Sequence, residues 1–232
     1  MEAEAAYHLG RVLRAEPGQL YELSDGRQVW LARVESVARD RIEFSLVEEM
    51  SAHIPSIETV LLLSIVKFDS FEWALEKATE LGVRRVVPLA ADRSEKALVA
   101  AAVKRSERWK KLLLEASQQS RRVRVPELGA CRRPEEAFSE AREELRLMLS
   151  EKPDAPELRS VLSDKRVRSI SLAIGPEGGW TESEFAAAKH AGFKQISLGG
   201  LILRTETAVI AALANVSYAL EGGEVSEEGS EQ

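Results

Sequence analysis

Residues 60–89, VLLLSIVKFDSFEWALEKATELGVRRVVPL, contain a complete strand–helix–strand unit. The short apolar run Val60–Val66 is typical of a strand that is buried on both faces of a parallel sheet. Val83–Leu89 repeats this pattern after Gly82, which is expected to end the intervening helix. The apolar residues of that helix recur at three- and four-residue spacing: Phe71, Ala74, Leu75, Ala78 and Leu81. This order of elements predicts an α/β domain.

The alternation of strands and helices continues along the chain. We expect further helices at about Arg105–Ser117, Pro134–Glu144, Glu157–Leu162, Glu182–Ala191 and Thr205–Leu220, and further strands at Leu145–Leu149, Val167–Ile174 and Gln195–Leu198. Asp69 or Ser70 is expected to cap the first helix, and Thr181 with Glu184 forms a capping-box sequence. The pattern predicts a three-layer α/β domain with a mostly parallel sheet.

Residues 18–47 have a two-residue period instead. Apolar and polar residues alternate there in three short runs joined by turns, which predicts a small antiparallel barrel or meander. The period changes between Glu48 and Glu58. We therefore take residues 1–52 as a first domain and residues 53–220 as a second.

The charge of the chain is unevenly distributed. The net charge is −6, but residues 221–232 hold five Glu and no Lys or Arg, and their composition predicts a disordered acidic tail. The remainder has 33 acidic against 32 basic residues. Lys104–Arg124 carries eight basic and only two acidic residues. Such a segment attracts a polyanion locally, so the negative net charge does not exclude a nucleic-acid partner.

Several classes of protein are excluded by composition. No apolar run approaches the roughly 18 residues of a membrane span, and the acidic amino terminus does not resemble a secretory signal. The one cysteine, Cys131, forms no internal disulfide, and His8, His53 and His190 lie too far apart in sequence to indicate a metal site. We expect a cytoplasmic protein with no membrane partner and no metal.

Two glycine-containing loops follow predicted strands, where ligands bind in α/β proteins. The first is Gly175-Pro176-Glu177-Gly178-Gly179, whose glycines would let a ligand approach the backbone. A tight turn explains this loop equally well. The sequence is neither a dinucleotide fingerprint nor a Walker motif, so a phosphate cradle is not supported.

The second loop, Leu198–Ala208, contains the apolar trio Leu201–Leu203 followed by Arg204, Thr205 and Glu206. Helix capping and the helix dipole account for Thr205 and Glu206 but not for Arg204. Two such loops at neighbouring strand ends would suit a flat heterocycle held by backbone hydrogen bonds.

The basic segment divides into two parts. A solvated helix face is the commoner explanation for four of its residues: Arg105, Arg108, Lys110 and Lys111. The other part, Arg121-Arg122-Val123-Arg124, places three arginines within four residues. Guanidinium groups bind phosphates in a bidentate manner, so this cluster indicates contact with nucleic acid.

Short motifs along the chain match one known family in order. They are Glu76–Val83, Arg93-Ser94, Arg108-Trp109, Glu115–Ser120, Ile174–Gly179 and Leu203–Ala208, with His8–Arg14 and Asp25-Gly26 in the first domain. Together they resemble the RsmE family, which methylates N3 of a uridine in small-subunit (16S) ribosomal RNA. The resemblance covers almost all of residues 7–220.

The resemblance implies a SPOUT-type α/β methyltransferase domain with a trefoil knot, a PUA-like RNA-binding β-barrel in residues 1–52, and a homodimer. S-adenosyl-L-methionine is the implied methyl donor. Its predicted walls are Leu149, Ser150, Ile174, Gly175, Gly178, Gly179, Leu198, Gly199, Leu203 and Thr205. The predicted catalytic residues are Arg204 and Glu206, and the predicted RNA contacts are Arg11, Arg14, Arg121, Arg122 and Arg124.

Two alternatives from other classes stay open at this point. One is a non-catalytic RNA-binding ribosome-assembly factor, and the other is an α/β enzyme that acts on a small nucleotide. The sequence also leaves open whether the substrate is naked ribosomal RNA or an assembled small ribosomal subunit. It departs from the family pattern at Leu201, where an arginine is usual.

Overall fold

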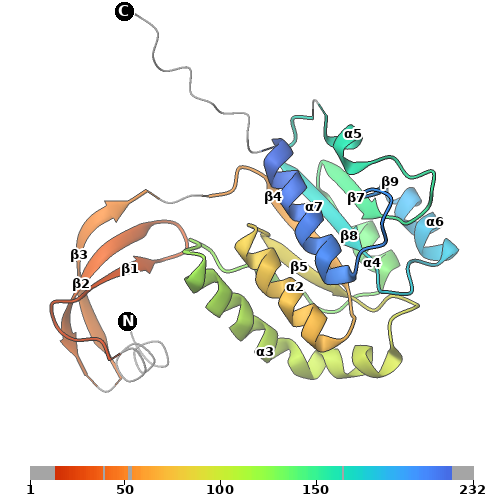
Figure 1. The fold of residues 1–232 in the computed structure, drawn as a ribbon. Coiled ribbons are helices and arrows are strands. Elements are labelled where there is room, and N and C mark those ends of the chain that lie inside the picture. Colours follow the sequence, from red (N-terminus) through yellow and green to blue (C-terminus); the bar gives the residue numbers. More distant parts are fainter. Residues whose placement is uncertain (1–13, 39, 52–53, 164, 221–232) are drawn as a thin grey trace, which may run out of the picture. The chain divides into compact units, whose positions relative to one another are not determined.

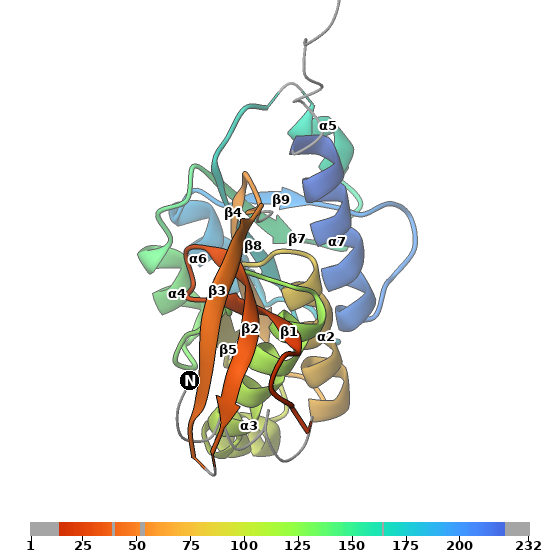
Figure 2. The same ribbon diagram turned by 90° about the vertical axis from the view of Figure 1, so that its left-hand side faces the viewer.

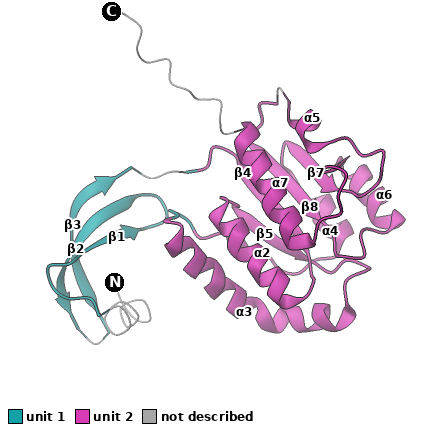
Figure 3. Cartoon of the chain, viewed as in Figure 1, with its two compact units in different colours: residues 1–54, 122–124 teal, residues 55–121, 125–232 magenta. Residues whose placement is uncertain are grey.

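The chain divides into two compact units (Figure 3). The structure is a computed structural model, and it describes residues 14–38, 40–51, 54–163 and 165–220. One unit contains the described residues up to Ile54 together with Arg122–Arg124, and the other contains the described residues from Pro55 onward without those three. Arg11 and the predicted acidic tail lie outside the described residues.

A six-stranded parallel sheet forms the centre of the larger unit (Figure 1). Its order is β6-β5-β4-β8-β7-β9. The strands are β4 (Glu58–Ser64), β5 (Arg85–Leu89), β6 (Glu127–Leu128), β7 (Leu145–Leu149), β8 (Ser169–Ile174) and β9 (Lys194–Ile196). Every pair in this sheet is parallel, so the carboxyl ends of all its strands lie at one edge. The predicted α/β class is confirmed.

Helices cover both faces of this sheet (Figures 1 and 2). They are α2 (Phe68–Glu80), α3 (Lys96–Gln119), α4 (Pro134–Glu140), α5 (Leu158–Leu162), α6 (Glu182–His190) and α7 (Thr205–Leu220). One buried cluster joins α2, α3, α5 and α7 to side chains such as Leu61 and Leu63 of β4. A second cluster joins α4 and α6 to the alternate side chains Val60 and Leu62. Strand β4 is therefore buried on both faces, as its apolar run predicts.

The segment that follows β7 encloses the end of β9. On one side, the Ser150 amide donates to the Ile196 carbonyl over 2.9 Å. On the other side, the Ser197 amide donates to the Pro156 carbonyl, also over 2.9 Å, and Glu157 forms a parallel bridge with Ser197. The chain that leaves β9 toward α7 thus passes between the two arms of this loop. This is the local arrangement expected of a trefoil knot, and the knot itself stays a prediction.

The smaller unit contains an antiparallel sheet of order β1-β2-β3. The strands are β1 (Leu20–Ser24), β2 (Val29–Val37) and β3 (Ile42–Met50), and their small core contains Ala15, Val34 and Ile42. Within this unit the Ser24 hydroxyl donates to the Val123 carbonyl over 2.8 Å, and Arg124 Nε donates to the Gly26 carbonyl over 2.7 Å. The described residues thus form a meander, while the barrel stays a prediction because residues 1–13 lie outside them.

The start of α2 differs from the prediction. Lys67, rather than Asp69 or Ser70, occupies the N-cap position, and its carbonyl accepts the Phe71 amide over 2.9 Å. The helix therefore begins at Phe68, and the two polar residues that suggested a cap lie inside its first turn.

Helices α3 and α4 also have other bounds than predicted. Helix α3 begins at Lys96 rather than near Arg105, and Leu98, Val99 and Ala102 in its first turns pack against the core, so its apolar stripe starts earlier than predicted. Helix α4 ends at Glu140 rather than Glu144, since Ala141 adopts an extended conformation.

A buried carboxylate links α2 to α3. Glu72 accepts hydrogen bonds from Arg105 Nη1 at 2.8 Å, from Arg108 Nη2 at 2.7 Å and from Trp109 Nε1 at 3.3 Å. The hydrogen bond from Arg108 is the main cause that lowers the pKa of Glu72, against the opposing effect of burial. Arg105 also lies 4.1 Å from the centroid of the Phe68 ring. Two arginines expected on a solvated face therefore join the helices.

Replacing this carboxylate tests its contribution to stability. Glu72→Gln should lower the free energy of unfolding at pH 7 by about 1–2 kcal/mol, because charged hydrogen bonds are lost and the arginines are partly solvated. The Glu72 pKa is lower in the folded chain, so this stabilisation is complete above the unfolded value of 4.5 and is lost as pH falls through the folded value. Urea denaturation at pH 7 and pH 3 measures both effects.

The exposed Glu107, which pairs with Lys110 on the surface of α3, provides the matched control. Glu107→Gln should change the free energy of unfolding by less than about 0.5 kcal/mol. A Glu72→Gln effect that stays constant from pH 7 to pH 3 would contradict the role of the charge.

Candidate functional site

Three loops meet at the carboxyl ends of β7, β8 and β9. The Thr205 hydroxyl donates to the Gly175 carbonyl over 3.3 Å, which joins the start of α7 to the loop after β8. The Ser150–Ile196 backbone bond described above joins the ends of β7 and β9. The structure therefore brings together the segments predicted as walls of the donor site: Leu149-Ser150, Ile174–Gly179 and Leu198–Thr205.

Trp180 packs against the glycine loop, which we define as Gly175–Gly179. Its indole N–H donates to the Leu149 carbonyl over 3.0 Å, and the side chain is buried. A Cβ added to Gly175 would lie 3.0 Å from indole Cε2, so no larger residue fits without a shift. Sequence reasoning did not include Trp180 in the site, although an aromatic residue directly after a glycine loop was an available signal.

Arg93 holds the glycine loop from the side of β5. Its Nη1 donates to the Gly178 carbonyl over 2.8 Å, and a Cβ added to Gly178 would lie 3.2 Å from Arg93 Cβ. The loop is closed by a 2.8 Å bond from the Gly179 amide to the Pro176 carbonyl, with Gly179 at a φ of 69°. The close neighbour of Gly178 is thus Arg93. This residue belongs to the family motif Arg93-Ser94, but it was not predicted as part of the donor site.

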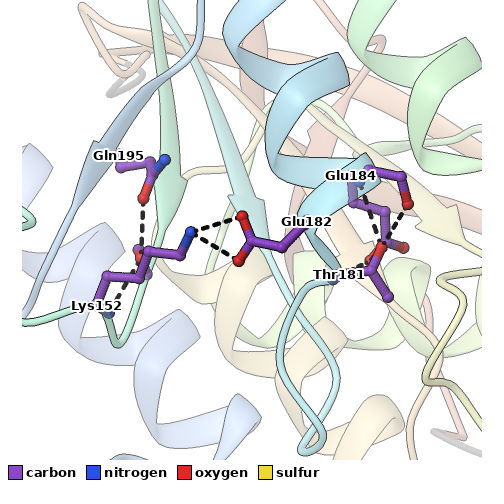
Figure 4. Close-up of polar contacts among 7 residues, drawn as sticks. Lys152, Thr181, Glu182, Glu184 and Gln195 are labelled. Atoms are coloured by element: carbon purple, nitrogen blue, oxygen red, sulfur yellow. Dashed lines mark hydrogen bonds and ion pairs between the residues drawn. The ribbon is translucent and has the colours of Figure 1, made fainter.

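The predicted capping box at the start of α6 is confirmed (Figure 4). The buried Glu184 carboxylate accepts the Thr181 amide at 2.7 Å, and the Thr181 hydroxyl accepts the Glu184 amide at 3.3 Å. The same carboxylate also accepts the Asp92 amide at 2.9 Å. One side chain therefore both starts α6 and ties it to the loop after β5.

Lys152 fixes the loop that encloses β9 to α6 (Figure 4). Its ammonium lies 2.9 Å from one Glu182 carboxylate oxygen and 3.1 Å from the other, and 4.2 Å from the centroid of the Phe185 ring. In the same loop, the Ser150 hydroxyl accepts the Lys152 amide and donates to Gln195 Oε1, both over 3.2 Å. Apart from the bond between Lys152 and Ser150, these contacts join residues 30 or more positions apart, so no local pattern predicts them.

The loop between β9 and α7 presents apolar side chains to solvent. Leu198 and Leu203 pack against the core, whereas Leu201 and Ile202 are 84% and 80% exposed. Gly199 has a φ of 113°, and a Cβ built on it would have no neighbour within 4 Å. The backbone of this loop is therefore accessible beside its glycine.

Arg204 precedes α7 and is exposed. Among the described residues, no carboxylate forms an ion pair with the Arg204 guanidinium. Arg204 therefore does not hold the loop through an ion pair within this part of the chain. Glu206 lies half-exposed in the first turn of α7, and Thr205 is buried. The catalytic roles of Arg204 and Glu206 stay predictions.

The predicted RNA contacts fall in both units. Arg122 and Arg124 belong to the smaller unit and Arg121 to the larger one. Arg14, Arg121 and Arg124 are exposed, whereas Arg122 is half-buried and burial lowers its pKa. Arg11 lies outside the described residues. The arginine cluster is thus partly fixed by its surroundings, and its role in RNA binding stays a prediction.

The described part of the chain contains neither a candidate metal site nor a helix that could cross a membrane. No group of three or more His, Cys, Asp and Glu residues there could hold a metal ion. Within the same ranges, no helix combines the length and apolar character that crossing a membrane requires.

Comparison with known proteins gives the family. Residues 53–217 match the family model described as the RNA methyltransferase domain. Over 219 residues the chain is 31% identical to the ribosomal RNA small subunit methyltransferase E of Synechocystis sp., covering 93% of this chain and 71% of that protein. The chain belongs to the RsmE family. The RsmE protein of Aquifex aeolicus is 28% identical over 88% of this chain and 87% of its own length.

Solved structures extend the RsmE similarity to three dimensions. The Neisseria gonorrhoeae ribosomal RNA small subunit methyltransferase E, bound to S-adenosyl methionine, is 32% identical, with a TM-score of 0.84 over 95% of this chain and 91% of that chain. Lpg2936 of Legionella pneumophila, in complex with the bound cofactor SAM, is 29% identical, with a TM-score of 0.84 over 94% and 90%. The family predicted from short motifs is confirmed.

The contact between Gly175 and Trp180 can be tested by adding one methyl group. Gly175→Ala should lower the free energy of unfolding by about 1–3 kcal/mol, because the new Cβ meets the buried indole ring and the neighbours must shift. Gly200→Ala is the matched control, since a Cβ there has no neighbour within 4 Å, and it should change stability by less than about 0.5 kcal/mol. Equal stabilities of the two variants in urea denaturation would refute the tight contact.

Proposed function

We propose that this chain is a cytoplasmic enzyme that transfers a methyl group from S-adenosylmethionine to N3 of a uridine in small-subunit ribosomal RNA. The observation that carries the proposal is the meeting of the three loops at the ends of β7, β8 and β9 in a chain of the RsmE family. Residues 53–220 would perform the transfer, and residues 1–52 would bind RNA.

The loops fit the proposed donor. Gly199 leaves its backbone groups accessible to a ligand, and the partly buried Leu198 and Leu203 offer apolar contact for a flat adenine ring. Trp180, Arg93 and Thr205 hold the loops in place through hydrogen bonds. The donor would thus be held mainly by backbone groups on a rigid support, which is the arrangement that precise positioning requires.

When bound, S-adenosylmethionine supplies a methyl group on a positively charged sulfur. The chain must then orient uridine N3 toward this methyl group, accept or pass on the N3 proton, and stabilise the negative charge that spreads onto the uracil carbonyls. The guanidinium of Arg204 has no carboxylate partner among the described residues, so it is available to donate to a uracil carbonyl. Glu206, two residues further along the chain, is the candidate proton acceptor.

We also propose a homodimer. Val209, Leu213 and Val216 of α7 are buried within the chain itself. The exposed apolar side chains Leu201, Ile202 and Tyr218 are the part of this region left for a second copy.

Replacing Arg204 separates donor binding from methyl transfer. Arg204→Ala should leave the affinity for S-adenosylmethionine within about threefold of wild type, because backbone and apolar groups remain in place. Methyl transfer to small ribosomal subunits should fall by at least ~100-fold, as when one donor to a developing oxyanion is removed. Arg204→Lys should recover little, since a point charge does not reproduce the planar guanidinium. Calorimetry and single-turnover transfer of labelled methyl measure the two effects.

Arg133→Ala, at an exposed position before α4 on the other face of the sheet, is the control and should transfer methyl at the wild-type rate. The catalytic role is contradicted by wild-type single-turnover rates in Arg204→Ala. A parallel loss of donor affinity and thermal stability would instead make Arg204 structural.

The arginine cluster is tested through the salt dependence of RNA binding. Changing Arg121, Arg122 and Arg124 to Ala should weaken binding to small-subunit RNA and flatten the slope of log affinity against log salt, by about one for each lost phosphate contact. Because Arg122 is half-buried, the double variant of Arg121 and Arg124 should be measured beside the triple one. An unchanged slope in both variants contradicts the proposed contact.

The proposed activity itself is tested with labelled S-adenosylmethionine and unmodified small-subunit RNA, both naked and in assembled particles. Label should enter one uridine, mapped by nuclease digestion. Donor binding without transfer would favour the RNA-binding assembly factor, and transfer to free nucleotides alone would favour an enzyme of small nucleotides.

A further inference from the structure

A hollow of about 330 Å³ lies on the β4 and β5 side of the glycine loop. Apolar side chains of Ile65, Val66 and Leu98 line it together with the charged groups of Lys67 and Arg93. This volume is at the lower end of the range for ligand pockets and suits a single nucleotide rather than a larger molecule.

Hydrogen bonds fix the walls of this hollow. The buried Ser94 hydroxyl donates to the Ile65 carbonyl over 2.7 Å, which joins the loop after β5 to the end of β4. The Arg93–Gly178 bond joins the same loop to the glycine loop after β8. Because β4 lies between β5 and β8, the hollow sits at the carboxyl ends of the central strands, beside the point where the strand order reverses.

Lys67 and Arg93 balance the carboxylates of Glu95 and Glu177 in the lining of the hollow, so the helix starts at its wall decide its preference for an anion. Lys67 occupies the N-cap of α2 and Glu95 that of α3, so both helices begin at its wall. Within the described residues, no side chain caps either helix, which leaves first-turn amides available. The positive ends of two helix dipoles, with Lys67 and Arg93, would attract a phosphate group.

The polar lining also complements a uracil edge. Uracil presents a carbonyl, an N–H group and a second carbonyl, whereas cytosine presents an acceptor at N3. Lys67 and Arg93 are donors for carbonyl oxygens, and uracil has one on each side of N3, whereas cytosine has only one. N3 itself is left to face the methyl donor.

We propose that this hollow receives the acceptor uridine, turned out of the RNA, with Lys67 and Arg93 as its binding residues. The proposal rests on the proposed function and adds to it the place of the base and the groups that select it. The glycine loop borders both the hollow and the proposed donor site, so a base in the hollow lies next to the donor. An unstacked base in a small polar pocket is how enzymes generally reach base atoms inside RNA or DNA.

Photocrosslinking locates the base directly. Small-subunit RNA carrying 4-thiouridine at the nucleotide mapped in the methyl-transfer assay is irradiated with the full chain, and crosslinked peptides are identified by mass spectrometry. Crosslinks should fall in residues 65–67, 93–98 or 177–178. Crosslinks confined to other segments, with RNA that wild type still methylates, overturn the proposal. A wild-type chain that methylates no RNA overturns the proposed function, and this inference with it.

Lys67→Glu provides an independent test. An acidic residue at a helix start is favoured by the dipole, so the fold should be kept while the hollow becomes negative. The kcat/KM for small-subunit RNA should fall at least ~30-fold, with the Kd for S-adenosylmethionine within about threefold of wild type. Lys189→Glu, with the same charge change on the exposed end of α6, should leave both values unchanged. A Lys67→Glu variant with wild-type kcat/KM contradicts the proposal.

Discussion

Burial of the central strands on both faces is the constraint on which the rest of the structure depends. Helices pack on each side of β4 and β8, so the residues of β4 from Thr59 to Ser64 are buried and have little room for polar chemistry. Polar groups are therefore displaced to the loops beyond the carboxyl ends. There Arg93, Ser94 and Glu184 each form a hydrogen bond to a neighbouring loop. These bonds join the separate loops into one rigid edge of the sheet.

Local sequence patterns predicted the helices and strands but not the long-range contacts. The bounds of β7 and α7 and the capping box of Thr181 were predicted, because each depends on neighbouring residues. The bond from Trp180 to Leu149 spans 31 positions and that from Arg93 to Gly178 spans 85, so neither follows from a local period. Sheet order decides which loops meet, and no pattern within one segment contains that order.

The glycine loop is supported from two sides. The Trp180 ring packs against Gly175, and the Arg93 side chain packs against Gly178 at the other end of the loop. Glycines are often associated with freedom of the backbone, but here they allow close contact with large side chains that remove such freedom. A loop held in this way presents its amides in one arrangement, so binding a ligand would require little ordering.

The contact of Gly175 with Trp180 also limits how the sequence can change over evolution. Any larger residue at position 175 would displace the indole ring, and a smaller ring at position 180 would leave the Leu149 carbonyl without its donor. Each single substitution is therefore harmful, and a paired change must preserve both the packed volume and a donor for the Leu149 carbonyl. Among descendants of this chain, positions 175 and 180 should therefore vary together or not at all. If one of the two residues is replaced, restoring it is easier than finding a compensating change at the other position.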